Sequence, residues 1–89
     1  MSQAIGNPEE LDRFAQSLSH FLETLNEVKN GLNQDFATLG DSWRDEKRLK
    51  FEEDYTLLLQ NLAQFESSAS EQIPYLHTLA SRLRDYLGS

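Results

Sequence analysis

The residues of this chain that could support chemistry are two histidines and a set of carboxylates. His20 shares one side of a predicted helix with Glu23 and Glu27, three and seven positions further on. Such a set could supply part of a surface metal site, but a solvated histidine is the simpler interpretation. The chain has no His-x-x-x-His or Glu-x-x-His pair from which helix bundles build metal sites, and His77 falls on a polar face.

The run of acids at Glu52, Glu53 and Asp54 does not form a paired carboxylate site either. Consecutive helical residues point about 100° apart, so these side chains form a charged shoulder. The sequence also contains no cysteine nucleophile and no glycine-rich phosphate loop. We therefore expect no enzyme activity, with no catalytic residue, no cofactor and no bound metal.

Composition limits the class of protein further. The chain has 89 residues, which suits one domain, and a formal net charge of -7, which makes nucleic acid and anionic membrane surfaces poor partners. A basic group at Arg44, Lys47, Arg48 and Lys50 is interpreted as a solvated helix start. No apolar run approaches the ~20 residues that a membrane-inserted helix requires, and the N-terminus lacks the pattern of a general signal peptide.

A heptad predicts the first helix, over about residues 8–39. Asn7 and Pro8 form a strong helix start, and a left-handed Gly40 is predicted to end the helix. Asn30-Gly31 could be a turn, but the heptad passes through it in phase, which favours one continuous helix. The apolar positions are Leu11, Phe14, Leu18, Phe21, Leu25, Val28, Leu32 and Leu39, widened by Leu22 and Phe36.

A second heptad predicts another helix, over about residues 46–87, after a turn at 40–45 that Asp41 or Asp45 could cap. Its apolar positions are Phe51, Tyr55, Leu58, Leu62, Phe65, Ala69, Leu76, Leu79, Leu83 and Tyr86, widened by Leu59, Ile73, Ala80 and Leu87. The serines at 67, 68 and 70 are poor helix formers, and Pro74 removes a backbone hydrogen bond. We expect a kink near 67–74 rather than a complete break.

Together the two patterns predict an all-α fold, a long antiparallel helical hairpin that dimerises into a four-helix bundle. The stripes are wide enough for each helix to contact two neighbours, and a lone hairpin buries little surface.

Asp35, at a central heptad position, is expected to pair with Lys47 or Arg48. Leu57 and Tyr75 lie off the main stripe and are predicted intermolecular contacts. The residues predicted to form the helix packing and the dimer interface are Leu11, Phe14, Leu18, Phe21, Leu25, Val28, Leu32, Tyr55, Leu58, Leu62, Phe65, Leu76 and Leu83.

The connection, Leu39-Gly40-Asp41-Ser42-Trp43-Arg44-Asp45, is the most specific segment of the sequence. A tryptophan between two long helices in so short a chain resembles the WXG family of small type VII secretion proteins, helical hairpins with a Trp-Xaa-Gly turn. The similarity extends from the Asn7-Pro8 start to the last helix. This chain has Asp45 in place of the glycine, and a helix-capping aspartate can occupy that site. The family's C-terminal Tyr-x-x-x-Asp/Glu export signal is not found, because Leu79 follows Tyr75 by four.

The resemblance implies a non-enzymatic protein interaction module, a secretion substrate or co-secreted adaptor. Its implied partners are a second copy or a related helical hairpin, and a secretion ATPase. It also implies secretion without a general signal peptide. The alternative is a cytoplasmic coiled-coil adaptor or structural protein unrelated to secretion.

The sequence allows two interpretations of Trp43. It could cap the hydrophobic end of the hairpin, packing on Phe36 and Leu39 from the first helix and on Lys47 or Phe51 from the second. It could instead form a docking patch with Arg44, Asp45 and Arg48, since the resemblance implies that the turn tryptophan contributes to recognition together with a partner's tail.

Overall fold

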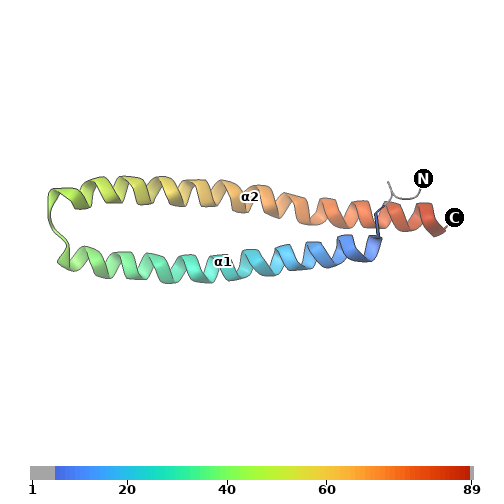
Figure 1. Cartoon of the computed structure of the whole chain (residues 1–89), viewed down its shortest axis with the longest axis horizontal. Helices are drawn as coiled ribbons and strands as arrows, with labels where there is room; N and C mark the ends of the chain where they lie inside the picture. Colours follow the sequence, from blue (N-terminus) through green and yellow to red (C-terminus); the bar gives the residue numbers. More distant parts are fainter. Residues whose placement is uncertain (1–5, 89) are drawn as a thin grey trace.

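The protein is a single pair of antiparallel helices. A computed structural model describes residues 6–88, in which α1 spans Pro8–Ser42 and α2 spans Glu46–Gly88. A link of three residues joins them into a rod with extents of 67 × 19 × 17 Å (Figure 1). The predicted all-α hairpin is confirmed, whereas its dimerisation into a four-helix bundle stays a prediction.

Asn7 begins α1, because its side-chain oxygen accepts hydrogen bonds from the backbone N–H groups of Glu9 (2.9 Å) and Glu10 (3.4 Å). The helix continues to Ser42, three residues beyond the predicted end at 39. The prediction of a left-handed Gly40 is wrong, because no residue among 6–88 has a positive φ angle. Instead the extended Trp43 ends the helix, and its backbone N–H donates to the Leu39 carbonyl at 2.9 Å.

The second helix runs without interruption through the segment 67–74. Pro74 is exposed there, so water can hydrate the carbonyl that its missing N–H leaves free. The predicted absence of a complete break agrees with this helix, and the kink itself stays a prediction.

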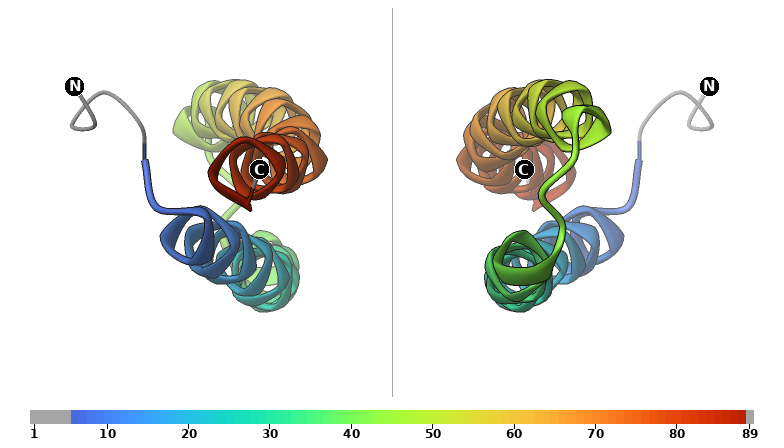
Figure 2. Two further views of the ribbon diagram at one scale, coloured as in Figure 1. Left: turned by 90° about the vertical axis from the view of Figure 1, so that its right-hand side faces the viewer. Right: turned by 90° about the vertical axis from the view of Figure 1, so that its left-hand side faces the viewer.

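The two helices meet along a seam of heptad positions. In the end-on views each helix has one neighbour (Figure 2). Every seam residue is buried or half-buried. The seam consists of Leu11, Ala15, Leu18, Leu22, Leu25, Lys29 and Phe36 from α1 and of Tyr55, Leu59, Leu62, Glu66, Ala69, Ile73, Leu76, Ala80 and Leu83 from α2.

Side-chain size changes along this seam. Aromatic rings pack near the link, where Phe36 and Tyr55 have ring centroids 4.5 Å apart and Phe51 stacks on Tyr55 at 6.4 Å. Towards the open end the most deeply buried residues are small, with Ala15 and Ala80 fully excluded from solvent. The link therefore closes over an aromatic cluster, while the far end is held by close helix approach.

Polar contacts fix the alignment of the two helices within the seam. Lys29 Nζ lies 2.7 Å from Glu66 Oε1, and both side chains are largely shielded from solvent. The Tyr55 hydroxyl donates a hydrogen bond to Asn33 Oδ1. A shift of one helix by a heptad would separate both pairs, so these contacts favour the observed register.

A three-residue cluster ties the open end of the hairpin. Asp12 Oδ1 lies 2.7 Å from His77 Nδ1, and Asp12 Oδ2 lies 2.7 Å from Arg84 Nη2. The hydrogen bond with His77, followed by that with Arg84, holds the pKa of the Asp12 carboxyl below its usual range. The ionised form of Asp12 thus favours the closed hairpin.

We expect this cluster to make stability depend on pH in the acidic range. A carboxyl whose folded pKa is lowered stabilises the fold above its unfolded pKa, about 3.9, and this contribution disappears as the pH falls through the folded value. In thermal melts followed by circular dichroism, Asp12→Asn should melt below the wild type at pH 7. The gap should narrow steadily below about pH 5. Glu71→Gln, which changes an exposed carboxylate that forms no ion pair within residues 6–88, is the control, and an equal pH trend in both variants would contradict the assignment.

Candidate functional site

The first candidate site is the link at the tip of the hairpin. Trp43 is half-buried there. Its indole packs against Phe51, with ring centroids 5.7 Å apart, and its Nε1–H donates to Asp45 Oδ1 at 2.7 Å. The tryptophan is thus oriented by one contact to α2 and one to the link itself.

Asp45 also begins the second helix. The same Oδ1 atom accepts a hydrogen bond from the backbone N–H of Lys47 at 3.0 Å, so Asp45 acts as the N-cap of α2. Of the two capping residues that the sequence allowed, Asp45 is the one that the structure selects. One carboxylate oxygen thereby couples the start of a helix to the position of an indole ring.

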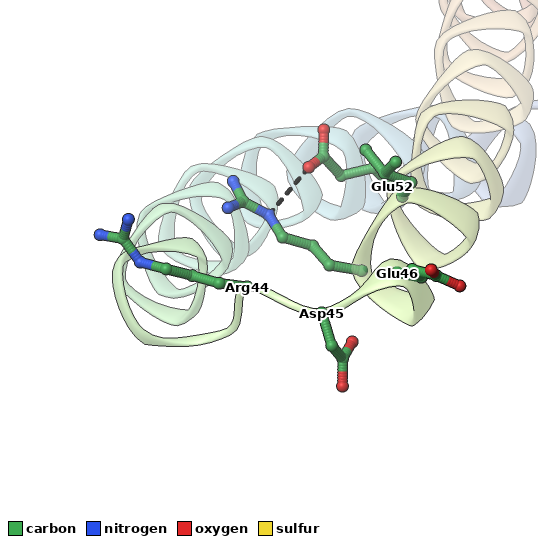
Figure 3. Close-up of a pocket in the computed structure, with 6 residues that line it drawn as sticks. Arg44, Asp45, Glu46 and Glu52 are labelled. Atoms are coloured by element: carbon green, nitrogen blue, oxygen red, sulfur yellow. Dashed lines mark ion pairs between the residues drawn. The ribbon is translucent and has the colours of Figure 1, made fainter.

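Arg48 braces the link from the inner side. Its Nη1 donates to the carbonyls of Gly40 (3.0 Å) and Trp43 (3.4 Å), and its Nε forms an ion pair with Glu52 Oε2 at 2.9 Å (Figure 3). Arg44 instead donates to the Asp41 carbonyl from Nη2 at 3.3 Å and projects outward (Figure 3). The predicted pairing of Asp35 with Lys47 or Arg48 is wrong. Arg48 has Glu52 beside it on the same helix, whereas Asp35 borders an apolar groove.

Gly40 makes room for that brace. A Cβ atom built on Gly40 would lie 2.8 Å from Arg48 Nη2 and 3.3 Å from its Cζ. Gly31, in the middle of the same helix, has no neighbour within 4 Å of its Cβ position. The two glycines of α1 therefore have different surroundings, and only at Gly40 would a Cβ atom meet a neighbour, the end of the Arg48 side chain.

This difference predicts that alanine stabilises the protein at one of these glycines and not at the other. Gly31→Ala should raise the free energy of unfolding by up to about 1 kcal/mol through helix propensity. The free energy of unfolding of Gly40→Ala should be at least about 1 kcal/mol lower than that of Gly31→Ala. The new methyl group displaces the Arg48 side chain from the two carbonyls that it binds. Urea unfolding of both variants measures the difference, and equal stability would show that Arg48 re-forms its contacts at no cost.

The second candidate site is a surface that we call the apolar face. It combines large apolar side chains from both helices that are at least two-fifths exposed. Phe21 and Phe65 meet edge-on at 6.1 Å, which shows that the two stripes lie on the same side of the hairpin. The apolar face consists of Phe14, Phe21, Val28, Leu32 and Leu39 from α1 and of Phe51, Leu58, Phe65 and Tyr86 from α2.

Near the tip this surface is hollowed into an apolar groove of about 310 Å³. Its walls are almost entirely hydrocarbon, and the one carboxylate at its border is Asp35. The groove is lined by Leu32, Asp35, Phe36, Leu39, Phe51, Tyr55 and Leu58. Nothing in residues 6–88 fills it, so a side chain from outside this hairpin would fit there.

The structure divides the predicted packing residues into two groups. Leu11, Leu18, Leu25, Tyr55, Leu62, Leu76 and Leu83 lie in the seam. Phe14, Phe21, Val28, Leu32, Leu58 and Phe65 lie on the apolar face, and the separately predicted Leu57 and Tyr75 are also exposed.

Sequence reasoning missed three seam residues, Ala15, Lys29 and Glu66. Lys29 and Glu66 each follow a seam leucine by seven positions, and this spacing was the signal that could have revealed them.

Two other kinds of site are absent from residues 6–88. No helix there has the length and apolarity needed to cross a membrane. No three or more residues from His, Cys, Asp and Glu gather closely enough in this part of the chain to hold a metal ion.

A long helical hairpin with a tryptophan in its link defines a class of small helical proteins, and comparison with known families agrees. The chain matches the WXG100 family, described as proteins of 100 residues with WXG, over residues 5–86. No curated protein and no solved structure matches.

The chain therefore belongs to the WXG100 family of small helical proteins associated with type VII secretion. Members of this family are not known as enzymes, typically pair as helical hairpins and are secreted without a signal peptide. Its departure from the family motif, Asp45 for glycine, lies at the residue that caps α2 and holds the indole.

Proposed function

We propose that this protein is an interaction module of type VII secretion that pairs with a second helical hairpin and travels as a substrate or co-secreted adaptor. The observation that carries this proposal is the apolar face. Phe14 is 60 % exposed and Val28 is 62 % exposed in the isolated hairpin, on a surface that runs along both helices. Contiguous exposed apolar surfaces of this kind are typical of association sites.

The seam supports the same proposal, because it excludes few side chains from solvent. Within residues 6–88 the buried residues are Tyr55 and three alanines, Ala15, Ala69 and Ala80, and no large side chain there is fully excluded from solvent. Small domains need extra burial to be stable. Covering the apolar face would remove large aromatic and aliphatic side chains from water, at roughly 25 cal/mol for each Å² of apolar surface.

The tip offers a second contact, for which we propose a docking partner such as the secretion ATPase. The half-buried Trp43 is followed in the chain by the outward-projecting Arg44, which lines a surface pocket together with the exposed Leu49. An aromatic ring next to a guanidinium and an aliphatic side chain is a common composition for a recognition site. Trp43 adjoins the apolar face through Phe51 but does not belong to it, so substitutions at Trp43 and at the distant Phe65 can distinguish the two contacts.

The mass of the purified chain in solution tests the main proposal. Light scattering at micromolar concentration, with the chain alone and mixed with helical-hairpin proteins from its own genome, should show a strongly helical dimer in at least one case. A chain that stays monomeric in all mixtures and still melts cooperatively would contradict the pairing.

A further inference from the structure

A smaller apolar surface lies on α2, outside the apolar face. Leu49 and Leu57 are both more than half exposed, and Glu53 stands between them at four-residue spacing. The two leucines are about 12 Å apart along the helix axis. We call the surface around this row the α2 flank. It consists of Glu46, Leu49, Glu52, Glu53, Thr56 and Leu57.

Two shallow hollows make the α2 flank continuous. The hollow nearer the link is lined by Arg44, Asp45, Glu46, Arg48, Leu49 and Glu52 (Figure 3). The next hollow, of about 570 Å³, is lined by Leu49, Glu52, Glu53, Thr56 and Leu57. Leu49 and Glu52 line both hollows, so one elongated ligand can extend through the two.

The nearest cations of α2 are already engaged by carboxylates. Arg48 forms an ion pair with Glu52 at 2.9 Å, and Lys50 forms one with Asp54 at 3.2 Å, each across one turn of the helix. Within each pair the two charges neutralise each other, so the pairs attract further charge only weakly. The charge that the α2 flank offers to a partner therefore comes from its other residues.

The remaining charges of the α2 flank are negative. Glu46 and Glu53 are exposed, and neither forms an ion pair within residues 6–88. The hollow at Leu57 is lined by carboxylates and, in the part of the chain that the structure describes, by no cation. The net charge of -7 adds attraction for a basic partner at longer range. A complementary surface therefore has lysine or arginine beside apolar side chains that cover the leucines.

The α2 flank stays accessible when the apolar face is covered. Leu49 and Phe51 are two positions apart, so their side chains point to nearly opposite sides of α2. Leu57 and Leu58 are consecutive and point about 100° apart. Because Phe51 and Leu58 belong to the apolar face, a second hairpin on that face leaves the α2 flank free to bind another partner.

A helical partner suits the α2 flank better than an extended one. The backbone groups of α2 are bonded within the helix, so a bound strand would find no backbone partners there. A helix satisfies its own backbone groups. Its side chains, at three- and four-residue spacing, can pack between Leu49, Glu53 and Leu57.

From this combination we infer that the α2 flank binds a basic amphipathic helix of another protein, with apolar side chains on Leu49 and Leu57 and a lysine or arginine opposite Glu53. The inference rests on the proposed function at one point, since Leu49 also lines the pocket at the tip that we propose for docking. It states the chemistry of that docking partner and extends the contact along α2. Pairing through the apolar face is independent of it.

A charged helical peptide tests the inference on the full chain. The probe is a labelled, stapled helix of about four turns, with leucines along one side and lysines beside them. Its twin has glutamates in place of the lysines. Fluorescence anisotropy should show that the lysine peptide binds at least about tenfold more tightly than the twin.

Matched substitutions separate a defined site from general charge attraction. Glu53→Lys should weaken binding of the lysine peptide about tenfold. Glu71→Lys makes the same charge change eighteen residues further along the same side of α2, and its affinity should stay within about threefold of the wild type. Leu57→Ala should also weaken binding about tenfold, whereas Tyr75→Ala, displaced by the same eighteen residues, should stay within about threefold.

Photo-crosslinking in the host tests the natural partner. A photoreactive amino acid at position 57 should crosslink to a protein other than the paired hairpin. Mass spectrometry should locate the product in a segment with apolar residues at three- and four-residue spacing and lysine or arginine beside them. The same group at position 75 should not give this product. Products confined to the paired hairpin, or a segment without this pattern, would overturn the inference.

The peptide results also distinguish the inference from the proposed function. Equal effects of Glu53→Lys and Glu71→Lys would indicate general charge attraction and overturn the inference alone. Binding that is lost in Phe65→Glu but kept in Leu57→Ala would place the peptide on the apolar face and overturn it as well. A chain that pairs with no hairpin, yet binds the lysine peptide through Glu53 and Leu57, would contradict the proposed pairing and leave the inference intact.

Discussion

Phe65→Glu is expected to convert the paired protein into a monomer while the hairpin remains helical. Phe65 lies near the middle of the apolar face, 46 % exposed in the isolated chain and in edge contact with Phe21. In a symmetric pair the substitution occurs twice, and each introduced carboxylate must lose water without gaining a partner. The dissociation constant should rise at least about 1000-fold, measured by sedimentation across a concentration series.

Leu57→Glu is the matched control for that experiment. Leu57 is another exposed apolar residue of α2, 57 % accessible, but it lies outside the apolar face. We expect its dissociation constant to stay within about threefold of the wild type, or roughly 0.7 kcal/mol. Equal loss of association in both variants would extend the interface to the neighbouring side of α2, and loss in Leu57→Glu alone would move it there, where the sequence predicts an intermolecular Leu57.

Trp43→Ala should destabilise the hairpin by about 1–3 kcal/mol, less than the ~3–5 kcal/mol that truncation of a fully buried tryptophan costs. The lower value follows from the half-burial of the ring. The substitution removes the packing of the indole on Phe51 and its hydrogen bond to Asp45. Urea unfolding measures the stability, and binding to the proposed docking partner or export from the host tests the proposed docking role.

Two milder variants separate the contributions at this site. Trp43→Phe keeps a ring against Phe51 but removes the indole donor, and Asp45→Gly restores the family's Trp-Xaa-Gly motif but removes the cap and the acceptor. Each should cost about 1 kcal/mol. If docking depends on the indole, the Trp43→Ala variant should fail to dock and the Asp45→Gly variant should still dock. Export unaffected by all three variants would exclude a docking role for the tip.

The helical hairpin could be predicted from the sequence because its signals are local and redundant. Asn7 caps α1 as its side chain predicts, and the leucines at 11, 18 and 25 all lie in the seam. The end of α1 was misplaced because Gly40 suggested a left-handed residue. Its actual role depends on Arg48, eight positions along the chain and on the other helix.

The division between seam and apolar face was beyond the sequence, since both carry apolar residues at heptad spacing. Phe14 and Leu18 are equally suitable for either surface by hydrophobicity. What decides is packing against the other helix, where the small Ala15 permits close approach and Lys29 finds Glu66. A polar residue such as Lys29 can be recognised as part of the seam only when its partner on the other helix is known.

The three-residue link has a mechanical consequence. The beginning of α1 and the end of α2 lie at the same end of the rod (Figure 1), so a force that separates the chain ends acts like opening a zipper. Such a force breaks the contacts between the helices one after another. The contact between Asp12 and His77 breaks first, and the contact between the rings of Phe36 and Tyr55 breaks last. Each broken contact also lengthens the loop that must close again, but the entropic cost of closing it grows only with the logarithm of its length. A translocating motor that grips one end would therefore meet many small barriers in sequence, in place of one large barrier.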